Sequence, residues 1–294
     1  MSQLSRRVEV DPSSFTHTHF VRLRTLIYQR TGIYFEDVKF DFVQKRVLSR
    51  MQTMEVAGFS TYFARLRLDT KGLELQELIN LLTVNETYFY REDYQFDCMV
   101  NSVLPELMKG RDKRDPIRIW SAPCSTGEEP YSIALTLLER WPALNDIDVE
   151  ITGSDIDTGV LERAKRGVFS ARSVQYVPPK ILKRHFNTLG QDAFQISDEI
   201  RQAIEFRHTN VVNTEDTKRF RDYDIIFCRN MLIYFDDASR RLAADAFYDA
   251  LRPGGFIFLG HSESMGRISS LFQPRRFPEC IAYQRPPLKS RRST

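Results

Sequence analysis

The sequence is poor in the residues that build covalently or metal-held folds. It has four cysteines in 294 residues, and no two of them have CxxC spacing. Because disulfide frameworks and thiolate metal sites need closely spaced cysteines, we expect neither, and we expect a reducing compartment. Among the five histidines, only His17 and His19 are close in sequence. We therefore expect no metal site.

Long apolar runs are also absent. No uninterrupted apolar stretch approaches the roughly 18 to 20 residues that a membrane-spanning helix needs, and the opening MSQLSRRVEVDPSS lacks the apolar segment of a signal peptide. The sequence therefore predicts a cytoplasmic protein that does not insert into a membrane. Its 42% of hydrophobic residues are enough for one large core or two smaller ones.

The net charge is small but unevenly distributed. A formal charge of +3 over this length does not predict a nucleic-acid partner. Residues 1–84 hold 12 basic and 9 acidic side chains, residues 284–294 hold 4 basic and none acidic, and the segment between them holds 26 basic against 30 acidic. The end of the chain, QRPPLKSRRST, has adjacent prolines and no apolar period, so we expect residues 285–294 to form a basic disordered tail.

The first 84 residues have an apolar pattern of helical period. From about residue 14 to residue 82, apolar side chains recur every three or four positions, with interruptions at Gly32, Gly58 and Gly72. This pattern predicts four or five short helices in an N-terminal domain over residues 1–84.

The second expected helix is basic, through Lys39, Lys45, Arg46 and Arg50. These side chains form either a solvated helix face or a docking surface for an acidic partner, because a positive surface raises the encounter rate with a negative one.

After residue 110, short apolar runs alternate with helical segments. The expected strands are 117–121, 149–154, 204–208, 224–228, 255–260 and 280–283, and the expected helices are 128–140, 158–165 and 238–251. Such alternation predicts an α/β fold with a parallel sheet covered on both faces, whose ligands bind beyond the carboxyl ends of the strands. Residues from about 169 to 203 interrupt the alternation, and we expect an inserted small antiparallel element there.

Polar residues follow the expected strands. Gly127 permits a tight turn after the first strand, and Glu128 and Glu129 begin the next helix, where carboxylates are favourable in any protein. After the second strand, Asp157 is suited to cap a helix, whereas Asp155 is the better ligand candidate, because a carboxylate accepts hydrogen bonds from both hydroxyls of a ribose.

Two further groups lie in the same predicted region. Arg229 and Asn230 follow the fourth strand, where they either satisfy loop backbone or bind a ligand, and Tyr234 comes shortly after them. Upstream, the aromatic segment VNETYFYRE links the helical domain to the sheet and contains Thr87 and Arg91, which would share a face if the segment were helical. Its aromatic residues suggest a wall against which a flat or apolar group packs.

Taken together, these segments resemble a known family. NETYFYRE, WSAPCSTGEEPYSIA, SDIDTGVLERAKRGVF, FCRNMLIYFD and LRPGGFIFLGHSES are similar, in order and spacing, to the signatures of the chemotaxis receptor methyltransferases of the CheR type, from about residue 14 to residue 284. The resemblance implies transfer of a methyl group from S-adenosylmethionine to glutamate side chains of the cytoplasmic domain of chemoreceptors. It also implies a helical N-terminal domain joined to a Rossmann-like methyltransferase domain over residues 85–284 that carries an inserted β-subdomain.

The resemblance also implies a set of site residues. Those expected to contact S-adenosylmethionine are Asn85, Thr87, Arg91, Glu129, Asp155, Asn210, Val211, Arg229 and Asn230. A glutamate acceptor has a pKa near 4.3, so it is ionised at neutral pH and needs no general base. Arg91 is the expected clamp for the acceptor carboxylate, and Tyr234 is expected to line the methyl-transfer cleft. RNMLIY stands where methyltransferases of amino groups carry an NPPY-type segment, which disfavours amine acceptors.

One departure from some family members bears on the partner. The segment NTLGQDAFQIS is short, whereas longer forms of this subdomain grip a C-terminal peptide of the receptor. We therefore expect no dependence on such a tether. Lys45, Arg46 and Arg50 then become the leading candidates for contact with the acidic receptor helices, and we expect a monomer.

Two other functions fit parts of the sequence. One is a methyltransferase that acts on a small carboxylic acid or a nucleic acid, which would not need a basic helical domain. The other is a protein that binds S-adenosylmethionine or its product as a signal, against which Arg91 and Tyr234 argue. A serine hydrolase is excluded because GHSES is not GxSxG.

Overall fold

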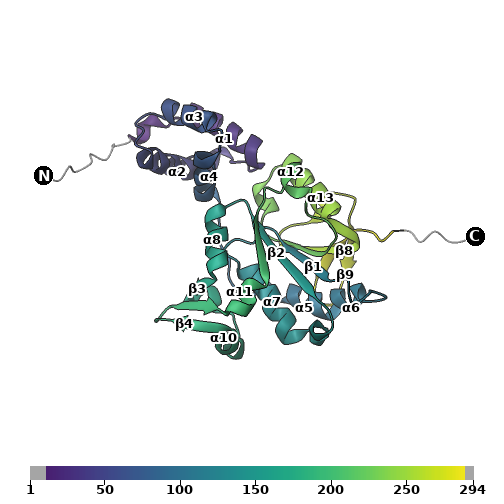
Figure 1. Ribbon diagram of the computed structural model, residues 1–294. Coiled ribbons are helices and arrows are strands. Elements are labelled where there is room, and N and C mark those ends of the chain that lie inside the picture. Colours follow the sequence, from purple (N-terminus) through teal and green to yellow (C-terminus); the bar gives the residue numbers. More distant parts are fainter. Residues whose placement is uncertain (1–10, 289–294) are drawn as a thin grey trace, which may run out of the picture. The chain divides into compact units, whose positions relative to one another are not determined.

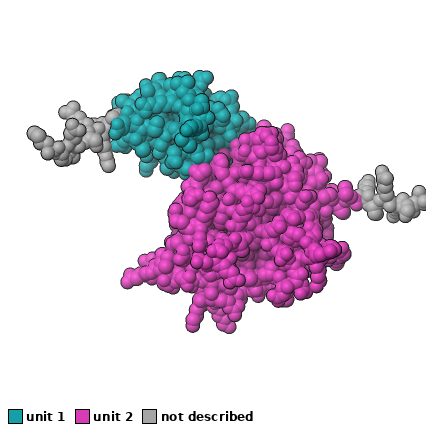
Figure 2. Space-filling view, viewed as in Figure 1, with its two compact units in different colours: residues 1–84, 234–236 teal, residues 85–233, 237–294 magenta. Residues whose placement is uncertain are grey.

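The computed structural model describes residues 11–288, which divide into two compact units (Figures 1 and 2). Unit 1 contains the chain up to Val84 together with residues 234–236, and unit 2 contains Asn85–Ile233 and the chain from Asp237 onward. Most of the predicted basic tail, residues 289–294, lies outside the described residues. The backbone N–H of Arg285 donates to the Gly255 carbonyl at 2.9 Å, so the ordered part of unit 2 extends one residue into that predicted tail.

Unit 1 is helical, as the apolar period predicts. Its helices are α1 (His17–Thr31), α2 (Phe40–Thr53), α3 (Phe59–Leu68) and α4 (Leu73–Leu82), with short 3-10 turns η1 (Pro12–Ser14) and η2 (Asp37–Lys39). Thr16 caps α1 by accepting the N–H of His19, and Gly32 ends it at φ 72°, a conformation that costs a residue without Cβ little. The inward faces share one core that includes Phe20, Val47 and Tyr62.

Residues 234–236 belong to unit 1 although they follow a strand of unit 2 in the chain. Phe235 forms a β-bridge with Ile33, and the Tyr34 N–H donates to the Tyr234 carbonyl at 3.3 Å. The hydroxyl of Tyr28 donates to Asp236 at 2.8 Å. The segment that follows the motif FCRN is therefore held by the helical domain.

Unit 2 is built on a seven-stranded sheet. The strands, in spatial order, are β6 (Ile204–His208), β2 (Val149–Asp155), β1 (Ile117–Ser121), β7 (Tyr223–Cys228), β8 (Leu251–Leu259), β10 (Ile281–Gln284) and β9 (Gln273–Arg276). The first five are parallel, and β10 and β9 are added antiparallel to them. From β1 the chain proceeds outward through β2 to β6 and then returns to β7 on the other side. The polar ends of β1 and β7 therefore flank the switch point where such sheets bind ligands.

The predicted strands are confirmed, with two differences. Strand β8 begins at Leu251 rather than at Gly255, because Leu251 pairs with Tyr223 before a register shift. Strand β9, QPRR, was not predicted, because an edge strand with mostly exposed polar residues has no apolar alternation.

Helices cover both faces of this sheet. The longer ones are α7 (Glu128–Arg140), α8 (Thr158–Arg166) and α13 (Asp237–Ala250); α7 packs on β1 and β2, α8 on β2 and β6, and α13 on β8 (Figure 1). The remaining short helical elements outside the insertion are α5 (Asp93–Cys98), a π-helical turn η3 (Met99–Val103), α6 (Leu104–Leu107), η4 (Pro142–Asn145), α12 (Thr214–Thr217), η5 (Leu232–Tyr234), whose last residue belongs to unit 1, and η6 (Met265–Arg267). The Rossmann-like fold predicted from the sequence is confirmed.

The insertion is a three-stranded antiparallel sheet, as predicted. Its strands are β3 (Val168–Ser170), β5 (Ala193–Ile196) and β4 (Phe186–Leu189), in that spatial order, with α9 (Ala171–Val174), α10 (Pro179–His185) and α11 (Asp198–Gln202) around them. Figure 1 shows this small sheet projecting from the main sheet of unit 2. Phe169 and Phe186 pack edge-on against Phe89, so the linker segment and the insertion share one core.

Candidate functional site

Asp155 lies at the carboxyl end of β2 and is almost completely buried, with 4% of its surface exposed. One of its oxygens accepts the N–H of Ser125 at 2.9 Å, and the other accepts the N–H of Asp157 at 2.9 Å. Burial and, to a smaller extent, the charge of the neighbouring Asp157 raise the pKa of this carboxyl to about 6, against the opposing effect of these hydrogen bonds. At neutral pH Asp155 is therefore mostly ionised, and it remains able to accept hydrogen bonds.

Two hydroxyl groups beside Asp155 have no partner in the described structure. They belong to Ser125, whose N–H is bonded to the Asp155 carboxylate, and to Thr209, whose N–H donates to the Asp155 carbonyl at 3.0 Å. Both hydroxyl oxygens are covered by the surrounding protein. The Asp155 carboxylate, at the carboxyl end of β2, is the acceptor of this cluster that matches a sugar-bearing ligand.

Glu129 and Arg229 form a buried ion pair at the switch point. The Arg229 Nε donates to Glu129 Oε2 at 2.5 Å, and Ser121 at the end of β1 donates its hydroxyl to Glu129 Oε1 at 2.7 Å. A second guanidinium nitrogen of Arg229 donates to the Arg91 carbonyl at 2.6 Å. Glu129, which follows β1, and Arg229, which follows β7, are therefore bonded to each other, and Arg229 is also bonded to the linker segment. Each of the two buried charges has a partner, which is what burial of an ion pair requires.

The linker segment is not helical. Residues 85–88 have no regular secondary structure and a turn follows, with Tyr90 and Glu92 in the left-handed region at φ 59° and 55°. The helical face that we considered for Thr87 and Arg91 therefore does not form. Thr87 is half-buried, and the Arg91 guanidinium donates to the Glu86 carbonyl at 3.0 Å.

The expected aromatic wall is only partly available. Phe89 is fully buried in the core of unit 2, and Tyr90 is 5% exposed. Tyr88 is half-buried, and its ring lies 5.2 Å from that of Tyr176. These aromatic side chains therefore mainly anchor the linker to the insertion, because packing within the protein already covers their faces.

Asn85 and Asp157 meet beside the second strand. The Asn85 amide donates to Asp157 Oδ2 at 2.8 Å, while Asp157 Oδ1 accepts the N–H of Val160 at 3.1 Å. Asp157 is therefore the N-cap of α8, as predicted, and it also holds the start of the linker.

Of the other expected site residues, the cofactor contacts lie in unit 2 and Tyr234 lies in unit 1. Asn210 and Val211 are buried in the loop after β6, two and three residues beyond the end of that strand. Asn230 is in the left-handed region at φ 58°. Tyr234 belongs to unit 1 and its side chain is 39% exposed.

Sequence reasoning missed Glu263, which organises the loops after β7 and β8. Its carboxylate accepts the N–H groups of Asn230, Leu232 and Gly260 at 2.8, 2.8 and 2.9 Å. A Cβ on Gly260 would lie 2.9 Å from both the side-chain amide nitrogen of Asn230 and the Glu263 carboxylate. The close packing of these two side chains against residue 260 therefore requires glycine there. The available signal was an acidic residue three positions after the glycine that follows a parallel strand.

The basic side chains of α2 differ in their surroundings. Arg50 forms a two-point ion pair with Glu74 at 3.0 and 2.5 Å, and Tyr62 also donates to Glu74. The Arg46 guanidinium lies 3.3 Å from the Phe42 ring centroid and donates to the Leu81 carbonyl at 2.7 Å. Lys45 is exposed, and among the described residues it has no ion-pair partner. Arg46 and Arg50 thus connect α2 to α4, and Lys45 is the cation of the three that faces solvent.

No group of three or more His, Cys, Asp or Glu side chains within residues 11–288 is arranged to hold a metal ion. No helix within the same range is long and apolar enough to cross a membrane.

Comparison with known proteins identifies the family of the chain. The all-alpha domain of CheR methyltransferases matches residues 18–83, and their SAM binding domain matches residues 85–281. Chemotaxis protein methyltransferase 2 of Vibrio cholerae serotype O1 is 51% identical over 92% of this chain and 94% of its own length. A protein of the same name from Pseudomonas aeruginosa is 38% identical over 87% of this chain and 90% of its own length. The chemotaxis protein methyltransferase of Escherichia coli K12 is 33% identical over 89% of this chain and 90% of its own length. The chain belongs to the CheR family of S-adenosylmethionine-dependent methyltransferases, as its motifs predict.

Proposed function

We propose that this methyltransferase esterifies glutamate side chains on the cytoplasmic domain of chemoreceptors. The observation that carries the proposal is the continuous similarity to proteins named chemotaxis protein methyltransferases, which spans both units and not the cofactor-binding unit alone. A methyltransferase for a small acid would not need the helical unit 1.

The reaction needs no proton acceptor. A glutamate side chain with a pKa near 4.3 is already ionised at neutral pH. S-adenosylmethionine, when bound, supplies a methyl group on a positively charged sulfur, which keeps the electron pair of the broken carbon–sulfur bond. One carboxylate oxygen of the acceptor forms the new bond to the methyl carbon, and no proton is transferred. Charges balance, so the main contribution of the protein is to position the two partners.

The residues of the site have separate roles in this proposal. Asp155 accepts hydrogen bonds from the ribose hydroxyls. The Glu129–Arg229 ion pair holds the side chains that follow β1 and β7 in position beside the cofactor. Arg91 holds the acceptor carboxylate, because its guanidinium has further N–H groups besides the one donated to Glu86. Tyr234 lines the transfer cleft. Asn85, Thr87, Asn210, Val211 and Asn230 complete the cofactor contacts.

The direct test uses methyl-labelled S-adenosylmethionine and receptor-containing membranes. Alkali treatment of the labelled receptor should release labelled methanol, because glutamate methyl esters hydrolyse in base. The variant Asp155→Asn should lose most of the label, and Asp245→Asn, an exposed change on α13, should keep it. Label that resists alkali, or that enters RNA or a small acid, would refute the proposal.

We also propose that Lys45, on the basic face of α2 that Arg46 and Arg50 complete, contacts the acidic receptor helices. Lys45 allows the cleanest test, because Arg46 and Arg50 also hold α4. Lys45→Glu should raise the KM for receptor several-fold without changing cofactor affinity. Lys71→Glu makes the same charge change at another exposed position of unit 1 and should have a smaller effect. Equal effects of the two variants would remove the case for a localised contact.

Finally, we propose that methylation does not depend on a tethering C-terminal receptor peptide. The turn between β4 and β5 has only three residues, Gly190–Asp192, which supports a compact subdomain without the longer stretch of the peptide-gripping forms. Receptors with and without their last residues should be methylated at the same rate. A large drop in rate on truncation would contradict this proposal.

A further inference from the structure

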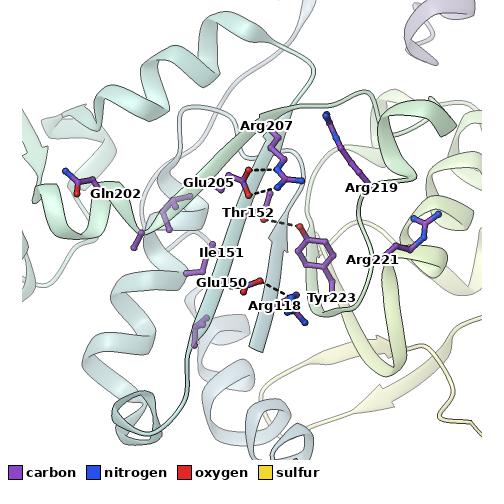
Figure 3. A pocket seen from close by; sticks show the side chains of 13 residues that line it. Arg118, Glu150, Ile151, Thr152, Gln202, Glu205, Arg207, Arg219, Arg221 and Tyr223 are labelled. Atoms are coloured by element: carbon purple, nitrogen blue, oxygen red, sulfur yellow. Dashed lines mark hydrogen bonds and ion pairs between the residues drawn. The ribbon is translucent and has the colours of Figure 1, made fainter. Parts of the chain in front are cut away.

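Unit 2 has a hollow on the side of the sheet where β6, β2 and β1 approach the segment between α12 and β7. Helix α12, which connects β6 to β7, has a single turn, Thr214–Thr217. A cavity of about 580 Å³ lies on this face of the sheet, and Figure 3 shows the side chains around it. Its volume is within the range of small-molecule sites, roughly 300–1,000 Å³.

Arginine dominates the polar lining. Four arginines and two glutamates line the cavity, so the ionised side chains give it a net charge of +2. They are Arg118, Arg207, Arg219, Arg221, Glu150 and Glu205. The floor is polar as well, since the buried Tyr223 hydroxyl donates to Thr152 at 3.0 Å. A cavity with this charge attracts anions.

The four arginines differ in what they already bind. Arg118 pairs with Glu150 at 2.8 Å, and Arg207 pairs with Glu205 at 2.7 Å. Both pairs are partly exposed and therefore weak, so a ligand can replace them at little cost.

Arg219 and Arg221 have no carboxylate partner among the described residues. Arg219 donates to the His208 carbonyl at 2.9 Å, and Arg221 donates to the Phe220 carbonyl at 2.6 Å. Each guanidinium carries five N–H donors in a fixed plane, so most donors of both side chains remain for a ligand. Both side chains are exposed and line the cavity. In Figure 3 Arg219 lies on the side of Arg207, whereas the Arg221 guanidinium points away from the side chains of β2 and β6.

We propose that this cavity binds a small anion that carries phosphate groups. Arginine is the side chain best matched to phosphate, because its planar donors bond two oxygens at once. Arg219 and Arg207 provide the primary contacts, and Arg221 and Arg118 provide further positive charge at the rim. The lining of the cavity includes Val149 to Thr152 of β2 and does not include Asp155.

Calorimetric titration of the full chain with inorganic pyrophosphate at low ionic strength tests the proposal. Saturating S-adenosylhomocysteine is present to keep the anion out of the cofactor site. One pyrophosphate should bind per chain, and the double variant Arg219→Gln/Arg221→Gln should weaken binding about tenfold or more. The control Lys180→Gln/Arg276→Gln removes the same charge from exposed positions elsewhere and should change affinity less than twofold.

A second measurement needs no variant, because Arg219 and Arg221 also support their own loop. In NMR spectra of the unaltered protein, pyrophosphate should shift the amide signals of Thr152, Glu205 and Tyr223 and leave those of β3–β5 in place. Absence of binding, an equal loss in the control double variant, or shifts only elsewhere would refute the proposal. A glutamate-rich peptide that binds with the same arginine dependence when pyrophosphate does not would also overturn it, in favour of an acidic protein contact.

Discussion

The titration of Asp155 gives a quantitative test of the cofactor site. Its pKa is raised to about 6, mainly by burial. If only the ionised carboxylate accepts the ribose hydroxyls, acidification removes the binding-competent form. The apparent Kd for S-adenosylhomocysteine should then rise about 1.1-fold at pH 7, about twofold at pH 6 and about elevenfold at pH 5, relative to pH 8, as expected for one proton and a pKa of about 6.

The direction of this effect follows from the ionised form being the acceptor. Affinity is complete above the pKa and falls tenfold per pH unit well below it. Two other titratable side chains, Cys124 and His208, lie near Asp155 and could add to the pH dependence. Burial raises the pKa of the Cys124 thiol well above its ordinary value, so this group stays neutral over the tested range. His208 lies opposite Asp155 in the β2–β6 register and requires a separate control.

Equilibrium binding measured between pH 5 and pH 8 provides the assay, with calorimetry or fluorescence as the readout. Asp155→Asn should bind more weakly at pH 8 and lose most of the pH dependence, whatever the ligand's own titration contributes. His208→Gln should keep the slope of the wild type. An unchanged slope in Asp155→Asn, or a flat profile in the wild type, would show that Asp155 is not the acceptor.

Three further predictions concern the network around the site and in unit 1. Glu129→Gln leaves the buried guanidinium of Arg229 without its counter-charge, so it should lower the free energy of unfolding, measured by urea denaturation, by about 3–5 kcal/mol. A loss below about 1 kcal/mol would mean that the ion pair is not buried in solution. Arg50→Ala should destabilise the protein by a similar amount, about 3 kcal/mol, because Glu74 is buried, whereas the exposed Lys45→Ala should stay within about 0.5 kcal/mol in the same denaturation series. Glu263→Ala should cost on the order of 2–4 kcal/mol and weaken cofactor binding, because three N–H groups lose a charged acceptor; thermal melts and binding titrations would contradict this if both were unchanged.

Several features of the fold could be predicted because they depend on neighbours in sequence. The helices of unit 1 follow a period of three to four residues, and the parallel strands are short apolar runs between helical segments. Asp157 was predicted as a helix cap because capping involves residues only three apart, and its bond to the Val160 N–H confirms this.

The side chains of the basic helix show where this reasoning stops. The spacing of Arg46 and Arg50 indicates that they share a helix face, but not that Glu74, 24 residues beyond Arg50, neutralises that arginine. An ion pair of this kind depends on how two helices pack, which no local period records. The same limit applies to the linker, where the aromatic residues were expected to face a ligand and instead pack largely within the protein.

The sequence by itself determined the helical domain, the parallel sheet, the insertion and the family motifs, because each depends on local periodicity or on the order of short segments. Only the tertiary structure decided which polar groups meet. It brought Arg229 to Glu129 across 100 residues and Glu263 to Asn230 across 33, and it placed Arg219 beside a cavity lined by strands of another part of the chain. The physical reason is that burying a charge requires a partner, and chain folding supplies that partner from positions whose separation in sequence carries no periodic signal.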